Sequence, residues 1–190
     1  MERIISSQEN LRKFEKYGTV IFIFNTKGEL LTCRENSSRE LTGKVKGELS
    51  VICETAESGE ALEETTLRGI KEELGLDENG ISNLLWLEPN TSYLGETIFI
   101  PGVLAGVVKF YCNDDHALLH EINNGRGDGE VSDICWMPID DLLENTNLRL
   151  GVRNVIQTSG DALDFRDFNT WLNSLTINNL RFAMEDVPNV

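Results

Sequence analysis

Hydrophobic runs separated by polar and turn-forming residues predict several β-strands along this chain. Residues 17–25 (YGTVIFIFN) form an apolar run without polar alternation, which is typical of a strand buried on both faces of a sheet. Shorter runs predict further strands at 29–34, 47–53, 84–87, 96–100, 103–112 and 130–137. Because a glycine inside a strand often marks an irregularity, we expect a bulge at Gly106.

Helical spacing of apolar residues predicts helices between and after these strands. The clearest lies within residues 59–76, and the others lie at 8–17, 138–144, 148–158 and 164–175, with a helix or a loop at 113–122. Strands before and after one central helix, closed by C-terminal helices, predict an α/β fold in which a mixed β-sheet lies between helices. We expect a single domain over residues 1–190, with the N-terminal and C-terminal helices packed on it.

The composition is that of a globular protein, with 40% hydrophobic and 26% charged residues. A net charge of −15 opposes non-specific binding to nucleic acid or to an anionic membrane, so we expect neither as a partner. We find no signal peptide and no apolar run near the ~20 residues that a membrane-spanning helix needs.

The cysteines favour a reducing compartment. Cys33, Cys53, Cys112 and Cys135 form no C-x-x-C pair. Cys33, Cys53 and Cys135 lie in apolar, strand-like segments, where a free thiol acts as a small hydrophobic group. Because free thiols persist in reducing compartments, we expect a cytoplasmic protein. The sequence leaves the oligomeric state open between a monomer and a homodimer.

The helix expected within residues 59–76 (GEALEETTLRGIKEELGL) gathers acidic side chains on one side. With Gly69 as the origin and about 100° per residue, Glu72 lies near about 300° and Glu73 near about 40°, so the two carboxylates flank position 69. The buried stripe, between roughly 100° and 160°, is expected to comprise Leu67, Ile70 and Leu74. Mg²⁺ prefers carboxylate oxygens and keeps waters and substrate phosphates as its other ligands. This helix therefore suits a divalent cation that binds a phosphate-containing substrate.

The spacing of these residues resembles the box of the Nudix hydrolases, G-x5-E-x7-R-E-U-x-E-E-x-G-U, where U is apolar. Seven of its nine defined positions match, and they are Glu60, Arg68, Ile70, Glu72, Glu73, Gly75 and Leu76. Two positions differ, because Glu54 stands in place of the first glycine and Gly69 in place of the glutamate after the arginine. The resemblance extends more loosely over residues 17–160 and implies a Nudix-type α/β/α sandwich with a mixed β-sheet.

The resemblance implies a metal-dependent enzyme that hydrolyses a diphosphate linkage in a small-molecule nucleoside diphosphate derivative. Glu72 and Glu73 would hold Mg²⁺ or Mn²⁺, Glu60 would anchor the loop or add a ligand, and Arg68 would orient the carboxylates. We expect the catalytic residues to be Glu73, Glu72, Arg68 and Glu130, and the metal ligands to be Glu72, Glu73, Glu60 and Glu130. Without a metal, the alternative is a solvated helix face with an i,i+4 pair between Arg68 and Glu72.

Gly69 leaves one carboxylate of the box unaccounted for. Glu130 is our first candidate for its replacement, because it begins a strand where some members of the family place a later acidic ligand; Asp128 and Glu121 lie nearby. Glu54 is the other alternative, either as a ligand or as an ordinary loop acid. The two departures also leave open a catalytically impaired module with the same fold that binds a nucleotide or has a regulatory role.

Other chemistry has weaker support in the sequence. His116 and His120 share a helix face, but no third zinc ligand follows at a recognised spacing, so we expect both on the surface. Candidate phosphate contacts are Arg34, Lys44, Lys46, Lys109 and Arg126. The Cys-His signature of isoprenoid diphosphate isomerases, which share the Nudix fold, is absent around Cys53.

Overall fold

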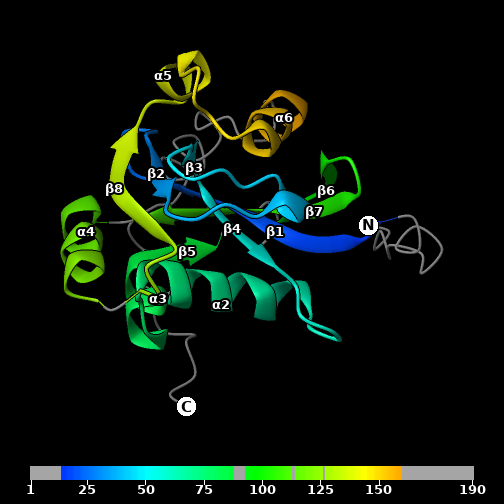
Figure 1. Cartoon of the computed structure of the whole chain (residues 1–190). Coiled ribbons are helices and arrows are strands. Elements are labelled where there is room, and N and C mark those ends of the chain that lie inside the picture. The colour runs from blue at the N-terminus through cyan, green and yellow to red at the C-terminus, as the bar shows by residue number, and fades with distance from the viewer. Residues whose placement is uncertain (1–13, 88–92, 113, 126, 160–190) are drawn as a thin grey trace.

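An eight-stranded β-sheet runs through the centre of the computed structural model, which describes residues 14–87, 93–112, 114–125 and 127–159 (Figure 1). The strands are β1 (Lys16–Phe24), β2 (Leu30–Glu35), β3 (Leu49–Ser50), β4 (Ile52–Thr55), β5 (Leu85–Leu87), β6 (Tyr93–Ile100), β7 (Val103–Cys112) and β8 (Val131–Met137). The helices are α2 (Leu62–Leu74), α3 (Glu78–Leu84), α4 (Asp115–Asn124), α5 (Ile139–Glu144), α6 (Leu150–Ser159) and the 3₁₀ turn η1 (Glu40–Thr42). The helix expected at 164–175 and most of that at 8–17 lie outside the described residues.

The sheet is mixed, as predicted. Its main path is β3-β2-β1-β7-β5, while β4 pairs with β1, β6 with β7 and β8 with β2. β1 and β7 run parallel along their length, and the other pairs are antiparallel. β1 therefore lies in the interior of the sheet, which explains why its sequence has no polar alternation.

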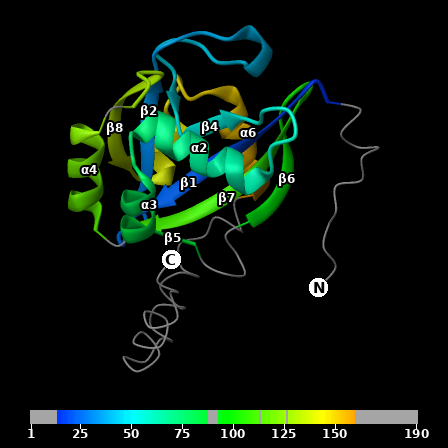
Figure 2. The same ribbon diagram turned by 90° about the horizontal axis from the view of Figure 1, so that it is seen from below.

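Two hydrophobic cores form because side chains of β1 alternate between the faces of the sheet. Val20, Phe22 and Phe24 lie in one core, and Ile21 and Ile23 lie in the other. The first core includes Val152, Val155 and Ile156 of α6, and the second includes Ile70 and Leu74 of α2 with Leu118 and Ile122 of α4. Figure 1 shows α2 below the sheet and α5 and α6 above it. Figure 2, which is seen from below, shows α2 lying across the near face of the sheet. This is the α/β/α arrangement that the sequence predicted.

The central helix α2 packs closely on β1 and β4 because small residues line its inner face. At its start, the N–H of Ala61 donates to the Glu64 carboxylate over 2.8 Å. The hydroxyls of Thr66 and Thr19 on β1 lie 3.2 Å apart. The helix ends at Gly75, whose φ of 68° is the left-handed conformation that glycine adopts without strain.

Three sequence-based expectations about burial and local structure are wrong. Leu67 is 46% exposed, because the buried face of α2 is centred on Gly69 and Glu73 and leaves Leu67 at its edge. Gly106 makes no bulge: β7 continues through it, and the missing side chain makes room for Leu62, whose Cδ1 would lie 2.6 Å from an added Cβ. Cys135 is exposed rather than buried, because alternate residues of β8 face solvent.

Candidate functional site

Arg68 on α2 binds three glutamates and thereby joins the helix to the preceding strand and loop. Its Nε lies 2.9 Å from Oε1 of Glu60, and its Nη2 donates to Oε2 of the same carboxylate over 2.9 Å. Nη1 lies 3.1 Å from Oε1 of Glu54 and 3.3 Å from Oε2 of Glu72. Nη2 also donates to the carbonyl of Thr55 over 2.8 Å. The guanidinium therefore fixes the positions of acids from β4, the following loop and α2.

Glu60 is a positioning residue in this arrangement. Besides both contacts with Arg68, its Oε2 accepts hydrogen bonds from the N–H of Glu57 over 2.8 Å and the hydroxyl of Thr65 over 3.0 Å. The hydrogen bonds from Arg68 and from the Glu57 backbone lower the pKa of Glu60 to about 2. Both oxygens take part in these contacts, which join the loop before α2 to the helix.

Glu72 and Glu73, adjacent in the sequence, have opposite environments. The Glu72 side chain is 46% exposed and contacts Arg68. The Glu73 side chain is only 6% exposed, and its Oε2 has no hydrogen-bond partner among the described residues. Burial, and then the neighbouring carboxylate of Glu35, hold the pKa of Glu73 well above its usual range. A buried carboxylate without a partner is unfavourable unless a proton or a cation joins it.

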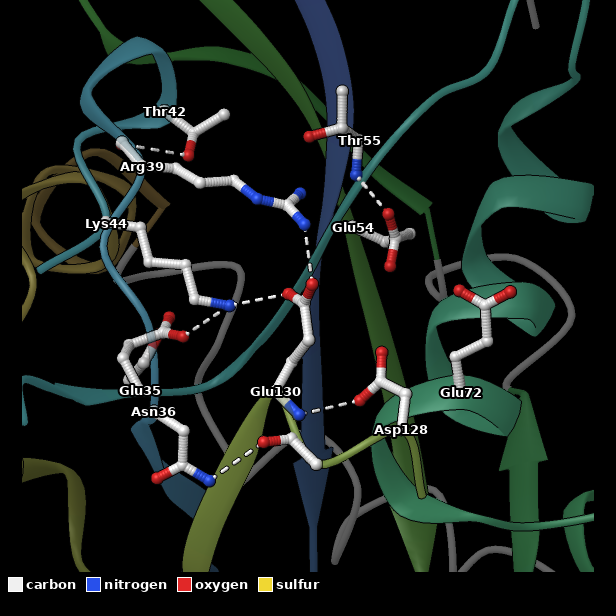
Figure 3. Close-up of polar contacts among 12 residues, drawn as sticks. Glu35, Asn36, Arg39, Thr42, Lys44, Glu54, Thr55, Glu72, Asp128 and Glu130 are labelled. Atoms are coloured by element: carbon white, nitrogen blue, oxygen red, sulfur yellow. Dashed lines mark hydrogen bonds and ion pairs between the residues drawn. The ribbon is translucent and has the colours of Figure 1, made fainter. Parts of the chain in front are cut away.

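The segment before β8 packs against the end of α2 and brings Asp128 to this acidic group. The N–H of Asp128 donates to the carbonyl of Glu72 over 2.7 Å. Asp128 lies close enough to contribute to the raised pKa of Glu73, after burial, Glu35 and Glu54. Figure 3 shows the carboxylates of Glu54, Glu72 and Asp128 on neighbouring elements, and Nη1 of Arg68 lies 3.1 Å from Glu54 and 3.3 Å from Glu72.

Glu130 lies beside Asp128, to which its N–H donates a hydrogen bond, and its carboxylate is paired with two cationic side chains (Figure 3). Its Oε1 lies 2.6 Å from Nη2 of Arg39, and its Oε2 lies 2.8 Å from Nζ of Lys44. The hydrogen bond from Lys44 holds the pKa of Glu130 below its usual range. Glu130 therefore orders the loop that carries Arg39 and Lys44, and each of its oxygens already has a cationic partner.

A buried network of charged side chains contacts the same loop. Nζ of Lys44 lies 2.9 Å from Oε2 of Glu35, and Nη1 of Arg149 lies 2.7 Å from Oε1. Arg149 also donates to the carbonyl of Thr42 over 2.9 Å and stacks over the ring of Phe99, with its Cζ 4.9 Å from the centroid. The network joins β2, the η1 loop and the start of α6.

A cleft next to the acidic group is lined by both cationic and apolar residues. The cationic residues are Arg39, Lys44 and Arg149, and the apolar residues include Val20, Phe99, Val103 and Ala105. Glu54 and Glu130 also line the cleft. Of the basic residues singled out from the sequence, only Lys44 lines it, while Arg126 lies outside the described residues. Sequence reasoning missed Arg39, Arg149 and Phe99, because no motif links residues so far apart in the chain.

The donor chemistry of the acidic group fits a hard divalent cation such as Mg²⁺ or Mn²⁺, which prefers carboxylate oxygens. The unpartnered Oε2 of Glu73 is the observation that carries this fit. Within the described ranges, no three His, Cys, Asp or Glu side chains already form a compact metal-binding cluster. His116 and His120 are exposed, as expected. No described helix is long and apolar enough to cross a membrane.

Comparison with known families gives one match that covers most of the chain. The family model described as NUDIX domain matches residues 15–158. No curated protein matches the chain.

Solved structures with the same fold come from several different organisms. A MutT protein from Methanosarcina mazei Go1 has a TM-score of 0.54 and 19% identity, over 77% of this chain and 93% of its own. A protein from Deinococcus radiodurans has a TM-score of 0.57 and 16% identity, over 77% of this chain and 84% of its own. An Ap4A hydrolase from C. elegans has a TM-score of 0.52 and 13% identity, over 84% of this chain and 99% of its own. At these identities the likeness concerns the fold.

Proposed function

The chain belongs to the NUDIX domain family, and from this premise we propose that it is a Mg²⁺- or Mn²⁺-dependent pyrophosphohydrolase. The proposed reaction is hydrolysis of a diphosphate linkage in a nucleoside diphosphate derivative. The observation that carries the proposal is the carboxylate of Glu73, which is 6% exposed and has an oxygen without a hydrogen-bond partner among the described residues. Such a group is expected where a cation completes the structure.

The cleft supports a substrate with an anionic part. Arg39 and Lys44 present positive charge to it, which suits phosphate oxygens. The apolar lining residues are buried: Phe99 is 3% exposed, and its ring packs against the guanidinium of Arg149. Since Glu54 lines the same cleft, phosphates held there lie next to the acidic group. A nucleoside diphosphate derivative supplies such phosphates.

Each residue of the acidic group has a distinct task in the proposed reaction. Glu72 and Glu73 would hold the cation, which when bound neutralises the phosphates and lowers the pKa of a water ligand. Arg68 fixes the orientation of Glu72, and Glu60 fixes Arg68. The buried carboxylate of Glu73, with one oxygen that has no hydrogen-bond partner among the described residues, is placed to hold the cation. Glu130 holds Arg39 and Lys44 toward the cleft.

A substrate panel tests the proposal. Purified protein is incubated with nucleoside triphosphates, nucleoside diphosphate sugars and Ap4A, with Mg²⁺ or Mn²⁺, and products are separated by anion-exchange chromatography. We expect cleavage of at least one substrate, dependent on the metal, and its loss in Glu73→Gln. Turnover by Glu73→Gln at the wild-type rate would refute the role of Glu73, and no cleavage of any substrate by folded wild-type protein would refute the function.

A nucleotide-binding module without hydrolysis is the second candidate. It is favoured by one observation: Glu54, Glu60, Glu72 and Glu130 are held by Arg68, Arg39 and Lys44, and no three acids of the described residues form a ready metal-binding cluster. Calorimetric titration of non-hydrolysable nucleotide analogues separates the two candidates. Binding of an analogue with no cleavage of the parent nucleotide in Mg²⁺ or Mn²⁺ would favour the module.

A further inference from the structure

The two positions at which the chain departs from the family box are in contact with each other. A Cβ added to Gly69 on α2 would lie 2.7 Å from Cβ and 3.2 Å from Cγ of Glu54 on β4. Carbon atoms that are not bonded pack no closer than about 3.5 Å at optimal separation. The stem of Glu54 therefore occupies the space into which a side chain at position 69 would extend. The missing side chain at 69 is what allows Glu54 to lie there.

The carboxylate of Glu54 belongs to the acidic group on α2. Its Oε1 accepts a hydrogen bond from the N–H of Thr55 over 2.8 Å and lies 3.1 Å from Nη1 of Arg68. Oε2 has no hydrogen bond or ion pair with any described residue. Arg68 thus orients Glu54 in the same way as it orients Glu72, and leaves one oxygen of Glu54 free. Figure 3 shows that this carboxylate lies on the same side as Glu72 and Asp128.

An independent observation on α2 also points to a cation. Glu73 is 6% exposed, and its Oε2 is buried without a hydrogen-bond partner among the described residues. A divalent ion stabilises a buried carboxylate that lacks another partner.

We propose that Glu54 supplies, from β4, the carboxylate that the family box places at position 69 of the helix, so that Glu54, Glu72 and Glu73 form the cation-binding set. This assignment rests on the proposed function, since it completes the same site. Glu130 is a less suitable replacement, because both of its oxygens are paired with Arg39 and Lys44. In this assignment the number of carboxylate ligands is unchanged, and one of them comes from β4 instead of α2.

Mn²⁺ binding tests the assignment without requiring turnover. The Kd for Mn²⁺ is measured by electron paramagnetic resonance of the free ion for wild type, Glu54→Gln and Glu130→Gln. The control is Glu63→Gln, which removes an exposed acid from α2 that has no role in the site. We expect Glu54→Gln to weaken binding at least about tenfold, since even outer-shell partners contribute that much. We expect Glu130→Gln and Glu63→Gln to bind like wild type. Wild-type affinity in Glu54→Gln would overturn the assignment.

A pair of exchanges tests whether positions 54 and 69 are interchangeable. Glu54→Gly should weaken Mn²⁺ binding, and adding Gly69→Glu in the same chain should restore the Kd to within about threefold, because the lost ligand returns at the family position. Gly69→Glu alone should lower the thermal midpoint, because the Cβ of Glu54 is fixed by its backbone and cannot move aside. Failure of the double variant to recover affinity while it remains folded would overturn the exchange.

The two readouts separate this inference from the proposed function. Wild type that binds Mn²⁺ through Glu54 but cleaves no substrate would remove the hydrolytic function and keep the ligand assignment. Wild type that cleaves substrate, with Glu54→Gln unchanged in both Mn²⁺ affinity and turnover, would remove the assignment and keep the function.

Discussion

Replacing Lys44 with methionine is expected to lower the free energy of unfolding by about 2–3 kcal/mol. Nζ of Lys44 lies 2.9 Å from Oε2 of Glu35, and the two side chains are 6% and 3% exposed. Removing one partner of a buried ion pair costs about 3–5 kcal/mol, because the other charge is left uncompensated. Arg149 still holds Oε1 of Glu35 at 2.7 Å and compensates part of its charge, so we place the effect at or just below the lower end of that range. The second pair of Lys44, with the partly exposed Glu130, adds less than about 1 kcal/mol.

The assay is urea unfolding followed by circular dichroism, with thermal unfolding as a second measurement. For a domain of this size, a loss of 2–3 kcal/mol corresponds to a fall in Tm of roughly 4–12 °C. Lys46→Met is the matched control, since Lys46 is an exposed lysine in the same loop. A double-mutant cycle with Glu35→Gln measures the coupling between the two charges directly. A loss below about 1 kcal/mol in Lys44→Met would refute the reasoning, because the pair would then behave as an exposed one.

Three further predictions concern other parts of the molecule. In native protein a thiol reagent at pH 8 should modify Cys135 first, because that residue is exposed while burial raises the pKa of the other three cysteines. Glu60→Gln should lower Tm at pH 7, because Arg68 holds the folded-state pKa of Glu60 below its usual value and the charged carboxylate stabilises the fold. The difference in Tm from wild type should shrink as the pH falls from about 4.5 to about 2, because this stabilisation is lost when the carboxylate is protonated. Gly151→Ala should destabilise the fold by about 1–3 kcal/mol, because the added methyl group overlaps the ring of Phe99.

Each of these predictions has its own contradicting result. Rapid modification of a second thiol in folded protein, or of any thiol in Cys135→Ser, would contradict the order of reactivity. A difference between Glu60→Gln and wild type that grows toward acid would reverse the expected sign. Gly151→Ala with an unchanged urea midpoint would mean that Phe99 moves aside freely.

The sequence predicts the fold well where the pattern is local. The strand β1 and the helix α2 were predicted correctly because their buried positions form a pattern among residues that are close in the sequence. Helix α3 was missed because it is short, and its one signal is the cap in which the side chain of Asp77 accepts a hydrogen bond from the N–H of Gly80. The exposure of Leu67 was missed because idealised angles give a helix face but not its depth against the sheet.

The candidate site is predictable only in the part that follows a motif. Arg68, Glu72 and Glu73 share one helix, so their spacing alone brings them together. The pairing of Glu35 with Arg149 joins residues 114 positions apart, and no local pattern encodes it. The contact of Glu54 with position 69 depends on how closely α2 packs on β4, and that distance is a property of the tertiary structure.

The close approach of Glu54 to Gly69 limits the evolutionary routes open to this enzyme. Consider a lineage with an acid at position 69 of the helix and glycine at position 54. If the acid at 54 appears first, the two side chains crowd one space. If the acid at 69 is lost first, the intermediate has a carboxylate at neither position. Such reciprocal dependence is epistasis, and it predicts covariation between the two positions. Among homologues, an acidic residue at one of these positions should be accompanied by glycine at the other.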